Sequence, residues 1–392
     1  IVANARPTKL DRYARFPVRY QPGHAVAAVL GMLVAGSSDY AEAFARAGEA
    51  VVLFGREGLD FAGTTALAQA CANLVIATGH YARPNNGLIA VWPRANDMGA
   101  WELGVPARDP RHWLAGAAAS WIVAADPVGD GRLSAADLRA LGPVVVQELF
   151  LTETAQAADV VLPAAAWAER EGTYTSGERR VQRFYPAVPA KGRPDHQIAA
   201  ELGARLGVAL PRFASQVFLE IARSVPAFAG LDYHALARVE PQFPAVGGRD
   251  LYYGGAAYAN AQGLGAQLKS GAERGQAVRP HTVDVPHTAE GLRLVPVTAL
   301  YDRGTTFAPS LLLHPRVTPA QARLNPADAA RLGVRAGDEI ELSGADWSAR
   351  VTARLDDQAP EGAVLLPESA GVAVPPGPIP VSVNVLAAVA AR

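Results

Sequence analysis

Cysteine is almost absent from this chain, since Cys71 is the only one among 392 residues. Iron–sulfur clusters and thiolate zinc sites need several thiolates at close spacing, so the chain by itself predicts neither. A single cysteine also excludes an internal disulfide framework, which favours an intracellular compartment. Cys71 lies in the apolar helical pattern TALAQACANLV. We therefore expect a buried small hydrophobic residue and assign it no chemistry.

A surplus of charge is missing as well. Lys+Arg number 36 and Asp+Glu 37, which gives a formal net charge of -1. Nucleic-acid binders usually carry a basic surplus, so we expect no nucleic-acid partner. The eight histidines show no metal-ligand spacing, and no metal site is predicted.

Long apolar runs are also lacking. The stretch 25–35 is about half the length that spans a bilayer, so no direct membrane insertion is expected. No signal peptide is visible at Ile1, where the chain opens on what reads as a strand inside a domain. We expect a further N-terminal portion to precede it.

What the first half does contain is an alternation of short apolar runs with helical patterns. This alternation predicts an α/β fold with a doubly wound, mostly parallel sheet covered by helices. The predicted strands are 50–54, 74–77, 120–124, 144–148 and 160–162, and the predicted helices are 24–33, 63–72, 135–141 and 194–206.

The organisation changes twice along the chain. We predict an α/β domain over 1–224, incomplete at its N-terminal side, and then a linker with extended loops over 225–299, where Gly, Pro, Tyr and Gln accumulate. From 300 to 392, short runs at 8–12-residue spacing predict a β-barrel. A short helix at 328–332 leads into a strand at 339–342.

Three stretches carry a family resemblance: NNGLIAVWPRANDMGAWELG over 85–104, a long one over 144–184 that includes LFLTETAQAADVVLP, and ARLNPADAARLGVRAGDEIEL over 322–342. In this order they resemble the molybdopterin oxidoreductase superfamily. The resemblance implies that the barrel is of the double-psi-like, dinucleotide-binding kind. AEREGTYTSGERRVQRF and LYDRGTTF look most like the C-terminal part of the G-subunit family of NADH-quinone oxidoreductase, respiratory complex I.

The G-subunit resemblance implies a bacterial, membrane-associated oxidoreductase complex of electron transport. That family carries iron–sulfur clusters on cysteine-rich N-terminal motifs that this chain does not contain, so no cofactor is expected in this part. The expected partners are the other peripheral-arm subunits. The expected location is cytoplasmic, on the inner face of the plasma membrane. No residue of the chain would then be catalytic.

A second interpretation is the cofactor-binding half of a molybdopterin-dependent oxidoreductase of formate dehydrogenase type, and a third is a stand-alone scaffold. Polar residues that follow predicted strands are where parallel sheets contact ligands. Thr152, Glu153 and Thr154 follow one such strand, but we favour a helix cap at Thr152 or Thr154, with Glu153 as an acid that compensates the helix dipole. If pterin binding is retained, the resemblance implies the following contacts: Asn96, Asp126, Thr152, Glu153, Asp159, Gln182 and Asn384.

The turn before Val181 departs from the superfamily pattern. Many relatives place glycine where this chain has Arg179. We expect this bulky side chain to crowd a close backbone approach to a ligand. Arg180 and Gln182 are candidates to hydrogen-bond a pterin or its phosphates, but we favour a surface or subunit contact for this Arg-rich turn.

Overall fold

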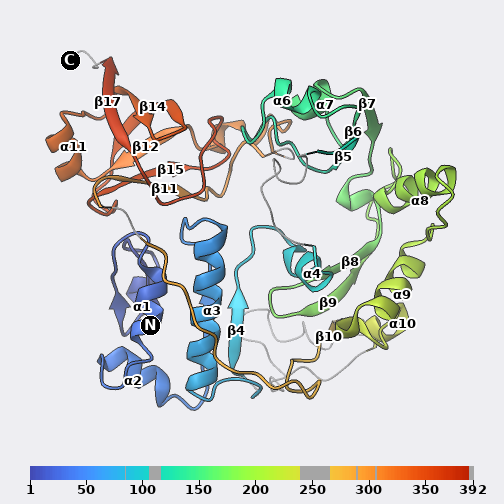
Figure 1. The fold of residues 1–392 in the computed structure, drawn as a ribbon, viewed down its shortest axis with the longest axis horizontal. Helices are drawn as coiled ribbons and strands as arrows, with labels where there is room; N and C mark the ends of the chain where they lie inside the picture. Colours follow the sequence, from blue (N-terminus) through green and yellow to red (C-terminus); the bar gives the residue numbers. More distant parts are fainter. Residues whose placement is uncertain (84, 106–115, 239–264, 288–289, 305–306, 388–392) are drawn as a thin grey trace.

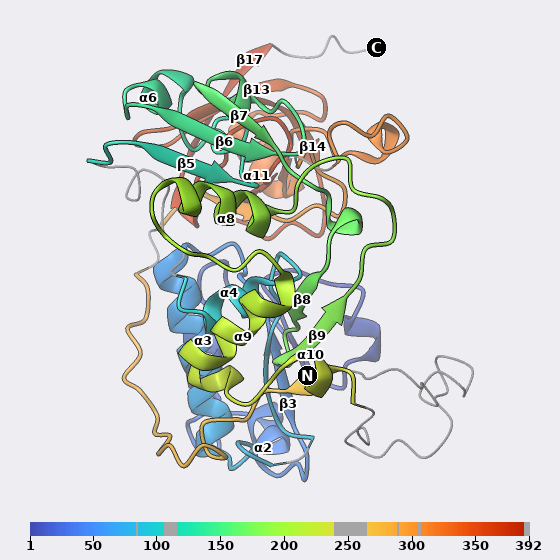
Figure 2. The ribbon, with the colours of Figure 1, turned by 90° about the vertical axis from the view of Figure 1, so that its right-hand side faces the viewer.

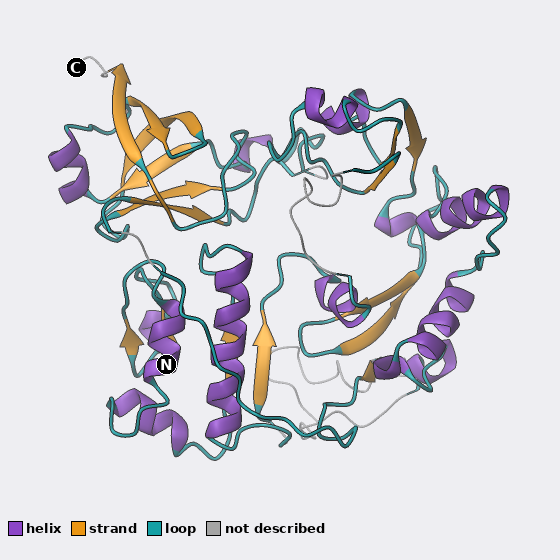
Figure 3. Cartoon of the chain, viewed as in Figure 1, coloured by secondary structure: helices purple, strands orange, loops and turns teal. Residues whose placement is uncertain are grey.

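The computed structural model describes residues 1–83, 85–105, 116–238, 265–287, 290–304 and 307–387. Figure 1 shows four groups of elements arranged around the centre of the molecule. We call them the N-terminal lobe (1–91), the central lobe (116–163), the hairpin lobe (strands β8–β10 with α4, α9 and α10) and the half-barrel (strands β11–β17). Figure 3 shows that helices dominate the N-terminal lobe and strands the half-barrel.

The N-terminal lobe is built on two short parallel pairs. Strand β1 (Val2–Ala3) pairs with β2 (Pro17–Val18), and β3 (Val51–Phe54) pairs with β4 (Gly87–Ala90). Helices α1 and α3 pack together and enclose a core that includes Val26, Leu67 and Cys71. Cys71 is buried as expected, and burial raises the pKa of its thiol to about 12. The helices are α1 (Ala25–Gly31), α2 (Asp39–Ala45) and α3 (Phe61–Ala77).

The predicted strand at 74–77 is wrong, because these residues form the last turn of α3. The helix begins after Asp60, whose side chain accepts a hydrogen bond from Gly63 N at 2.7 Å. Leu74 and Val75 are both buried on its inner face. Tertiary packing along this continuous face outweighs the strand preference of Val75 and Ile76. Strand β4, the true partner of β3, was not predicted.

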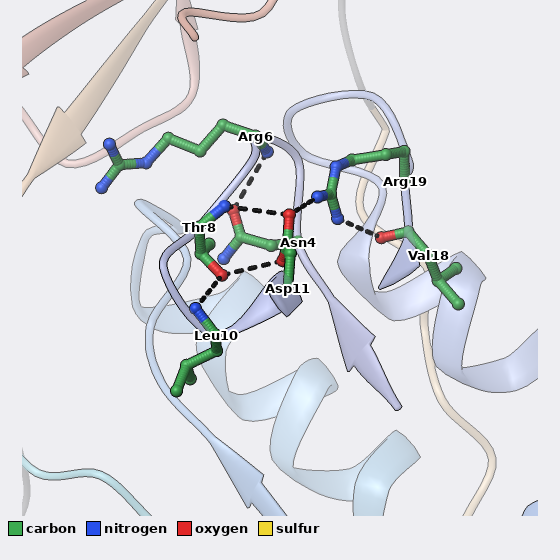
Figure 4. Close-up of polar contacts among 7 residues, drawn as sticks. All are labelled: Asn4, Arg6, Thr8, Leu10, Asp11, Val18 and Arg19. Carbon is green, nitrogen blue, oxygen red and sulfur yellow. Dashed lines mark hydrogen bonds and ion pairs between the residues drawn. The ribbon is translucent and has the colours of Figure 1, made fainter. Parts of the chain in front are cut away.

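Polar contacts around Asp11 organise the chain's first turn (Figure 4). The Asp11 carboxylate accepts hydrogen bonds from Thr8 N at 3.1 Å and Thr8 Oγ1 at 2.9 Å, and it also pairs with Arg19. Arg19 in turn donates to the carbonyl of Val18 in β2 at 3.0 Å. These contacts hold β2 beside β1.

The central lobe confirms the predicted strands. Strands β5 (Ser120–Val123), β6 (Val144–Glu148) and β7 (Val160–Pro163) form a parallel sheet in the order β5-β6-β7. Helices α6 (Ala135–Arg139) and α7 (Glu153–Gln156) cover one face, with Leu138, Val144 and Val146 in the shared core. The carboxyl ends of all three strands lie at the same edge.

The hairpin lobe contains a small antiparallel sheet in the order β10-β9-β8. Its core gathers Val181, Phe218 and Leu236. Helix α8 (Asp195–Arg205) lies between this lobe and the central lobe, as Figure 2 shows. The remaining bounds are α4 (Asp97–Glu102), β8 (Gly172–Thr175), β9 (Arg180–Phe184), α9 (Ala214–Ser224), α10 (Tyr233–Leu236) and β10 (Ala266–Gln267).

Residues 225–299 were expected to form a linker with extended loops, but the described part of this segment also contains a helix and two strands. It contributes α10 and β10 to the hairpin lobe and β11 (Arg293–Val297) to the half-barrel; residues 239–264 lie outside the described residues. Between them the chain returns along the N-terminal lobe, where Asn73 exchanges two hydrogen bonds with His281, at 2.7 and 2.9 Å. Arg293 also donates to the carbonyl of Pro22 at 3.0 Å.

The half-barrel is a curled seven-stranded sheet in the order β16-β11-β15-β12-β14-β13-β17. Its core includes Leu294, Leu324, Ile340 and Leu366, each at 0% exposure. Helix α11 (Pro326–Leu332) is capped by Asn325 and ends at Gly333, whose φ of 68° suits glycine. The other strands are β12 (Gln321–Leu324), β13 (Glu339–Ser343), β14 (Ser348–Leu355), β15 (Ala363–Pro367), β16 (Ile379–Pro380) and β17 (Ser382–Ala387).

The predicted fold class is confirmed: a mixed α/β arrangement with parallel sheets precedes a curled C-terminal β-sheet. The parallel strands form separate small sheets, β3-β4 and β5-β6-β7, within the described residues. No helix in the part of the chain that the structure describes is both long and apolar enough to cross a membrane.

Candidate functional site

The carboxyl edge of the central sheet is held by a polar network between Asp126 and Thr154. Asp126 follows β5, and its Oδ1 accepts hydrogen bonds from Thr154 N at 2.9 Å, Thr154 Oγ1 at 2.6 Å and Gly129 N at 3.1 Å. Thr154 is fully buried, and its hydroxyl also accepts from Val128 N at 3.0 Å. The network ties the loop after β5 to the first turn of α7.

Two further carboxylates lie at this edge. Glu148, the last residue of β6, is only 5% exposed, and burial raises its pKa above the ordinary glutamate value, with Asp126 adding to the rise. Burial likewise raises the pKa of Asp130, opposed by Arg132 and Arg94. Among the described residues neither of these two guanidinium groups forms an ion pair. The edge thus combines carboxylates with two cations that the described residues leave without an ion pair.

The half-barrel packs directly against this edge. A Cβ placed on Gly131, which has a φ of +67°, would lie 2.4 Å from the Cβ of Ala373, so the loop after β5 touches the segment after β15. In that segment, the carbonyl of Ser369 accepts a hydrogen bond from the backbone N–H of Arg303, which follows β11, at 2.7 Å, and the Arg303 guanidinium lies beside Gly371. The carboxyl edge of the central sheet therefore faces the half-barrel across a seam.

The loop after β3 closes on the half-barrel in the same manner. Arg56 forms an ion pair with Glu368, just beyond β15. Glu57 accepts hydrogen bonds from Tyr20 Oη at 2.8 Å and Asn4 Nδ2 at 3.2 Å. Burial raises the pKa of Tyr20, and the neighbouring Glu57 carboxylate raises it further. Burial also raises the pKa of Glu57.

Three strained residues lie along this seam. Glu57 follows β3, Ala124 follows β5 and Ser369 follows β15, and their φ values are 54°, 51° and 53°. Left-handed backbone costs energy for residues other than glycine and gathers at functional sites. The strain therefore points to the seam as the candidate functional site.

Asp126, Thr152 and Glu153 are brought together at this edge, as the strand ends predicted. Thr152 Oγ1 accepts a hydrogen bond from Ala155 N at 3.2 Å, so it caps α7. Glu153 is exposed in the first turn of that helix. The positions of Thr152 and Glu153 agree with the interpretation as a helix cap and a first-turn acid. Contact of these two residues with a ligand stays a prediction.

The other four predicted residues lie elsewhere. Asn96 precedes α4, and its Oδ1 accepts from Thr175 N in the hairpin lobe at 2.9 Å. Asp159 precedes β7 at the opposite, amino edge of the central sheet, where its Oδ2 accepts from Val144 N at 2.7 Å. Gln182 is exposed in the middle of β9, and Asn384 is exposed in β17 of the half-barrel. The structure does not assemble the seven into one cluster.

Arg179 occupies the turn between β8 and β9 in a left-handed conformation, with a φ of 65°. Glycine adopts this left-handed conformation more readily than arginine does. Its Nε donates to Glu102 Oε1 at 2.5 Å, and its Nη1 donates to the carbonyl of Lys269 at 3.0 Å. The bulky side chain is thus fastened to α4 and to the segment after β10.

Two family models match the chain. Residues 14–205 match the molybdopterin oxidoreductase model, and residues 292–391 match the molydopterin dinucleotide binding domain model. The two matched stretches follow one another along the chain. The second match begins at residue 292, next to β11, the first strand of the half-barrel along the chain.

Two kinds of relative bear on the interpretations above. The alpha subunit of F420-dependent formate dehydrogenase 2 of Methanococcus maripaludis is 34% identical over 45% of this chain and 32% of its own length. The second G-type subunit of the NADH-quinone oxidoreductase of Rhizobium meliloti is 25% identical over 94% of this chain and 48% of its own length. The chain thus spans about a third to a half of these curated relatives.

Among solved structures, acetylene hydratase from Pelobacter acetylenicus superposes with a TM-score of 0.61 and 16% identity. The superposition covers 93% of this chain and 66% of that one. This likeness shows a shared fold.

Four of the seven predicted contact residues already accept hydrogen bonds from within the chain. The acceptor atoms are Asn96 Oδ1, Asp126 Oδ1, Thr152 Oγ1 and Asp159 Oδ2, and each accepts a hydrogen bond from a backbone N–H of this chain. A dinucleotide needs donors for its phosphates; Arg94 and Arg132 offer charged ones, whereas the amides of Asn96, Gln182 and Asn384 offer neutral ones. In the part of the chain that is described, no group of three His, Cys, Asp or Glu side chains is placed to hold a metal.

Proposed function

We propose that this chain is the cluster-free C-terminal region of the G subunit of a proton-pumping NADH-quinone oxidoreductase, acting as a structural part of the peripheral arm. The observation that carries the proposal is the Asp126–Thr154 network. In this network, polar atoms at the carboxyl edge of the central sheet bond to one another and join the loop after β5 to α7. Buried polar atoms paired in this way serve the packing of the fold. In this role no residue of the chain is catalytic.

The comparison with the Rhizobium meliloti protein supports the same proposal, because the similarity runs along 94% of the chain. The formate dehydrogenase of Methanococcus maripaludis matches only 45% of it. The proposed partners are the other subunits of the peripheral arm, and the proposed location is the cytoplasmic face of the membrane that holds the complex. The redox centres would then lie in other parts of the assembly.

The alternative is the cofactor-binding half of a molybdopterin-dependent oxidoreductase of formate dehydrogenase type. Arg94 and Arg132, which form no ion pair with described residues, favour it, because they lie at the carboxyl edge where a phosphate would be received. The higher identity to the formate dehydrogenase over its shorter match points the same way.

The deciding measurement is the molybdenum and pterin content of the intact protein, purified without chelator. Elemental analysis gives the metal, and fluorescence of the oxidised pterin gives the cofactor. We expect near-zero content and co-purification with NADH-oxidising subunits. About one molybdenum per chain would overturn the proposal in favour of the alternative.

A variant pair sharpens this measurement. Under the alternative, replacing both Arg94 and Arg132 by Ala removes the pterin, whereas Arg139→Ala on the exposed side of α6 leaves its content unchanged. Under our proposal neither change alters the pterin signal, and co-purification with the partner subunits persists in both. Failure of the unmodified protein to co-purify with these subunits would contradict the structural role.

A further inference from the structure

A pocket of about 130 Å³ lies in the hairpin lobe, away from the seam. Helix α9 supplies an apolar floor, and the start of β8, the start of α8 and the start of α10 supply a polar rim. The floor residues are Ala214, Val217 and Ile221, and the rim residues are Glu171, His196 and Tyr233. One wall is therefore suited to hydrocarbon and the other to hydrogen bonding.

The one negative charge on the rim is already compensated. Arg183 in β9 donates to Glu171 Oε2 at 2.8 Å. The same guanidinium carbon lies 4.2 Å from the centre of the Tyr233 ring and 4.3 Å from that of Tyr185. The pocket thus gains no attraction for a charged ligand from this pair.

Tyr233 carries the polar atom that needs a partner. Its hydroxyl oxygen is buried and has no hydrogen-bond partner within the described residues. A buried hydroxyl without a hydrogen bond lowers the stability of the fold, so this group favours binding a partner such as a ligand hydroxyl. Burial raises the pKa of Tyr233, which keeps the hydroxyl protonated and able to donate.

His196 adds a second neutral group. Burial lowers its pKa, although Glu171 and the backbone of Arg212 oppose this shift. The ring is therefore mainly uncharged at neutral pH, and its nitrogens can donate to or accept from a ligand.

The size of the pocket sets the size of its ligand. An engineered apolar cavity of about 150 Å³ holds one benzene molecule. We propose that this pocket binds a small neutral ring that carries one hydroxyl, with the ring on the α9 floor and the hydroxyl between Tyr233 and His196. This site lies outside the seam and is independent of the function proposed above.

Phenol is the probe that tests the size and chemistry, with benzene as its apolar counterpart. We expect saturable phenol binding to the 392-residue chain in ligand-observed NMR, with a Kd on the order of 1 mM. Val217→Phe fills the floor and should abolish the binding of both rings. Leu219→Phe, on the same helix but outside the pocket, should preserve it. Absence of saturation, or unchanged binding in V217F, would overturn the proposal.

The hydroxyl is tested by a variant that keeps the fold. Phenol should bind roughly two- to tenfold more tightly than benzene, which is the range for one hydrogen bond. In Tyr233→Phe that ratio should fall to about one while benzene still binds, whereas Tyr185→Phe, which faces the same arginine from outside the pocket, should keep the original ratio. An unchanged ratio in Y233F would refute the assignment even if V217F fails to fold.

Discussion

The half-barrel and the central lobe are both built on strands, but they bury their apolar residues differently. The half-barrel encloses Leu324 and Ile340 in one cluster at 0% exposure. The central lobe packs one face of its sheet on α6 and α7, while Trp121 and Val123 on the other face are each 41% exposed. Parallel sheets are usually covered on both faces. The half-barrel is thus well packed by apolar contacts, whereas the central lobe relies on polar contacts at its carboxyl edge.

The largest effect should come from breaking the half-barrel core. Leu324→Ala removes a fully buried side chain and should lower the free energy of unfolding by about 2–5 kcal/mol. Val123→Ala on the open face of the central sheet should change it by less than about 0.5 kcal/mol. Urea unfolding of both variants measures the difference. Equal losses would show that the two regions are packed alike.

A smaller effect should follow from cutting the polar network of the central lobe. Thr154→Val keeps the shape but removes the hydroxyl shared by Asp126 and Val128, and it should cost about 1–3 kcal/mol. Hydrogen exchange at the Val128 amide should rise as well, because that amide loses its acceptor.

The control is Thr65→Val, whose exposed hydroxyl bonds only to the carbonyl of Phe61 in its own helix. We expect no measurable loss there. If Thr154→Val were as stable as Thr65→Val, the network would contribute nothing to the free energy of unfolding.

The smallest effect concerns pH. Burial raises the pKa of Glu148, so the folded state binds this proton more tightly than the unfolded chain does. Stability should therefore fall as pH rises from below 4.5, the ordinary glutamate value, through the raised one. Glu148→Gln should flatten that part of the curve in urea titrations at several pH values.

Glu153→Gln removes the same charge from an exposed side chain at the same edge and is the matched control. If E153Q flattened the curve as much as E148Q, general charge repulsion rather than burial of one carboxyl would explain the slope.

Much of the central lobe was predictable because its strands are short, β-branched and bounded by turns. The strand at 144–148 was predicted with the bounds that the structure has. The strand at 74–77 was wrong, because an apolar run cannot be assigned from its own pattern when a helix continues through it. Strand β11 was not predicted, because it is short and lies in a Pro-rich and Gly-rich part of the sequence. Its partner β15 lies far along the chain, so no local pattern indicates the pairing.

Residues of the candidate site were predictable only where they directly follow a predicted strand. Asp126, Thr152 and Glu153 meet because parallel strands end at one edge. Asp159 could have been separated from them, since it precedes its strand. Glu148 was missed as a site residue, because its role depends on burial. Thr154 was noted after its strand and as a possible cap, but its hydrogen bond to Asp126, 28 residues away, was not predicted. The pocket at Tyr233 had no local signal, since it joins residues from four elements.

The pairing of Asn73 with His281, and of Pro22 with Arg293, has a consequence for synthesis of the chain. The N-terminal lobe is made before the half-barrel, yet it is completed by residues made more than two hundred positions later. At ordinary translation rates that interval is roughly 10–40 s. During this time its helices stand incompletely covered on the ribosome. A chaperone that shields α1 and α3 would therefore act before the half-barrel exists, and slower translation would prolong the need for it.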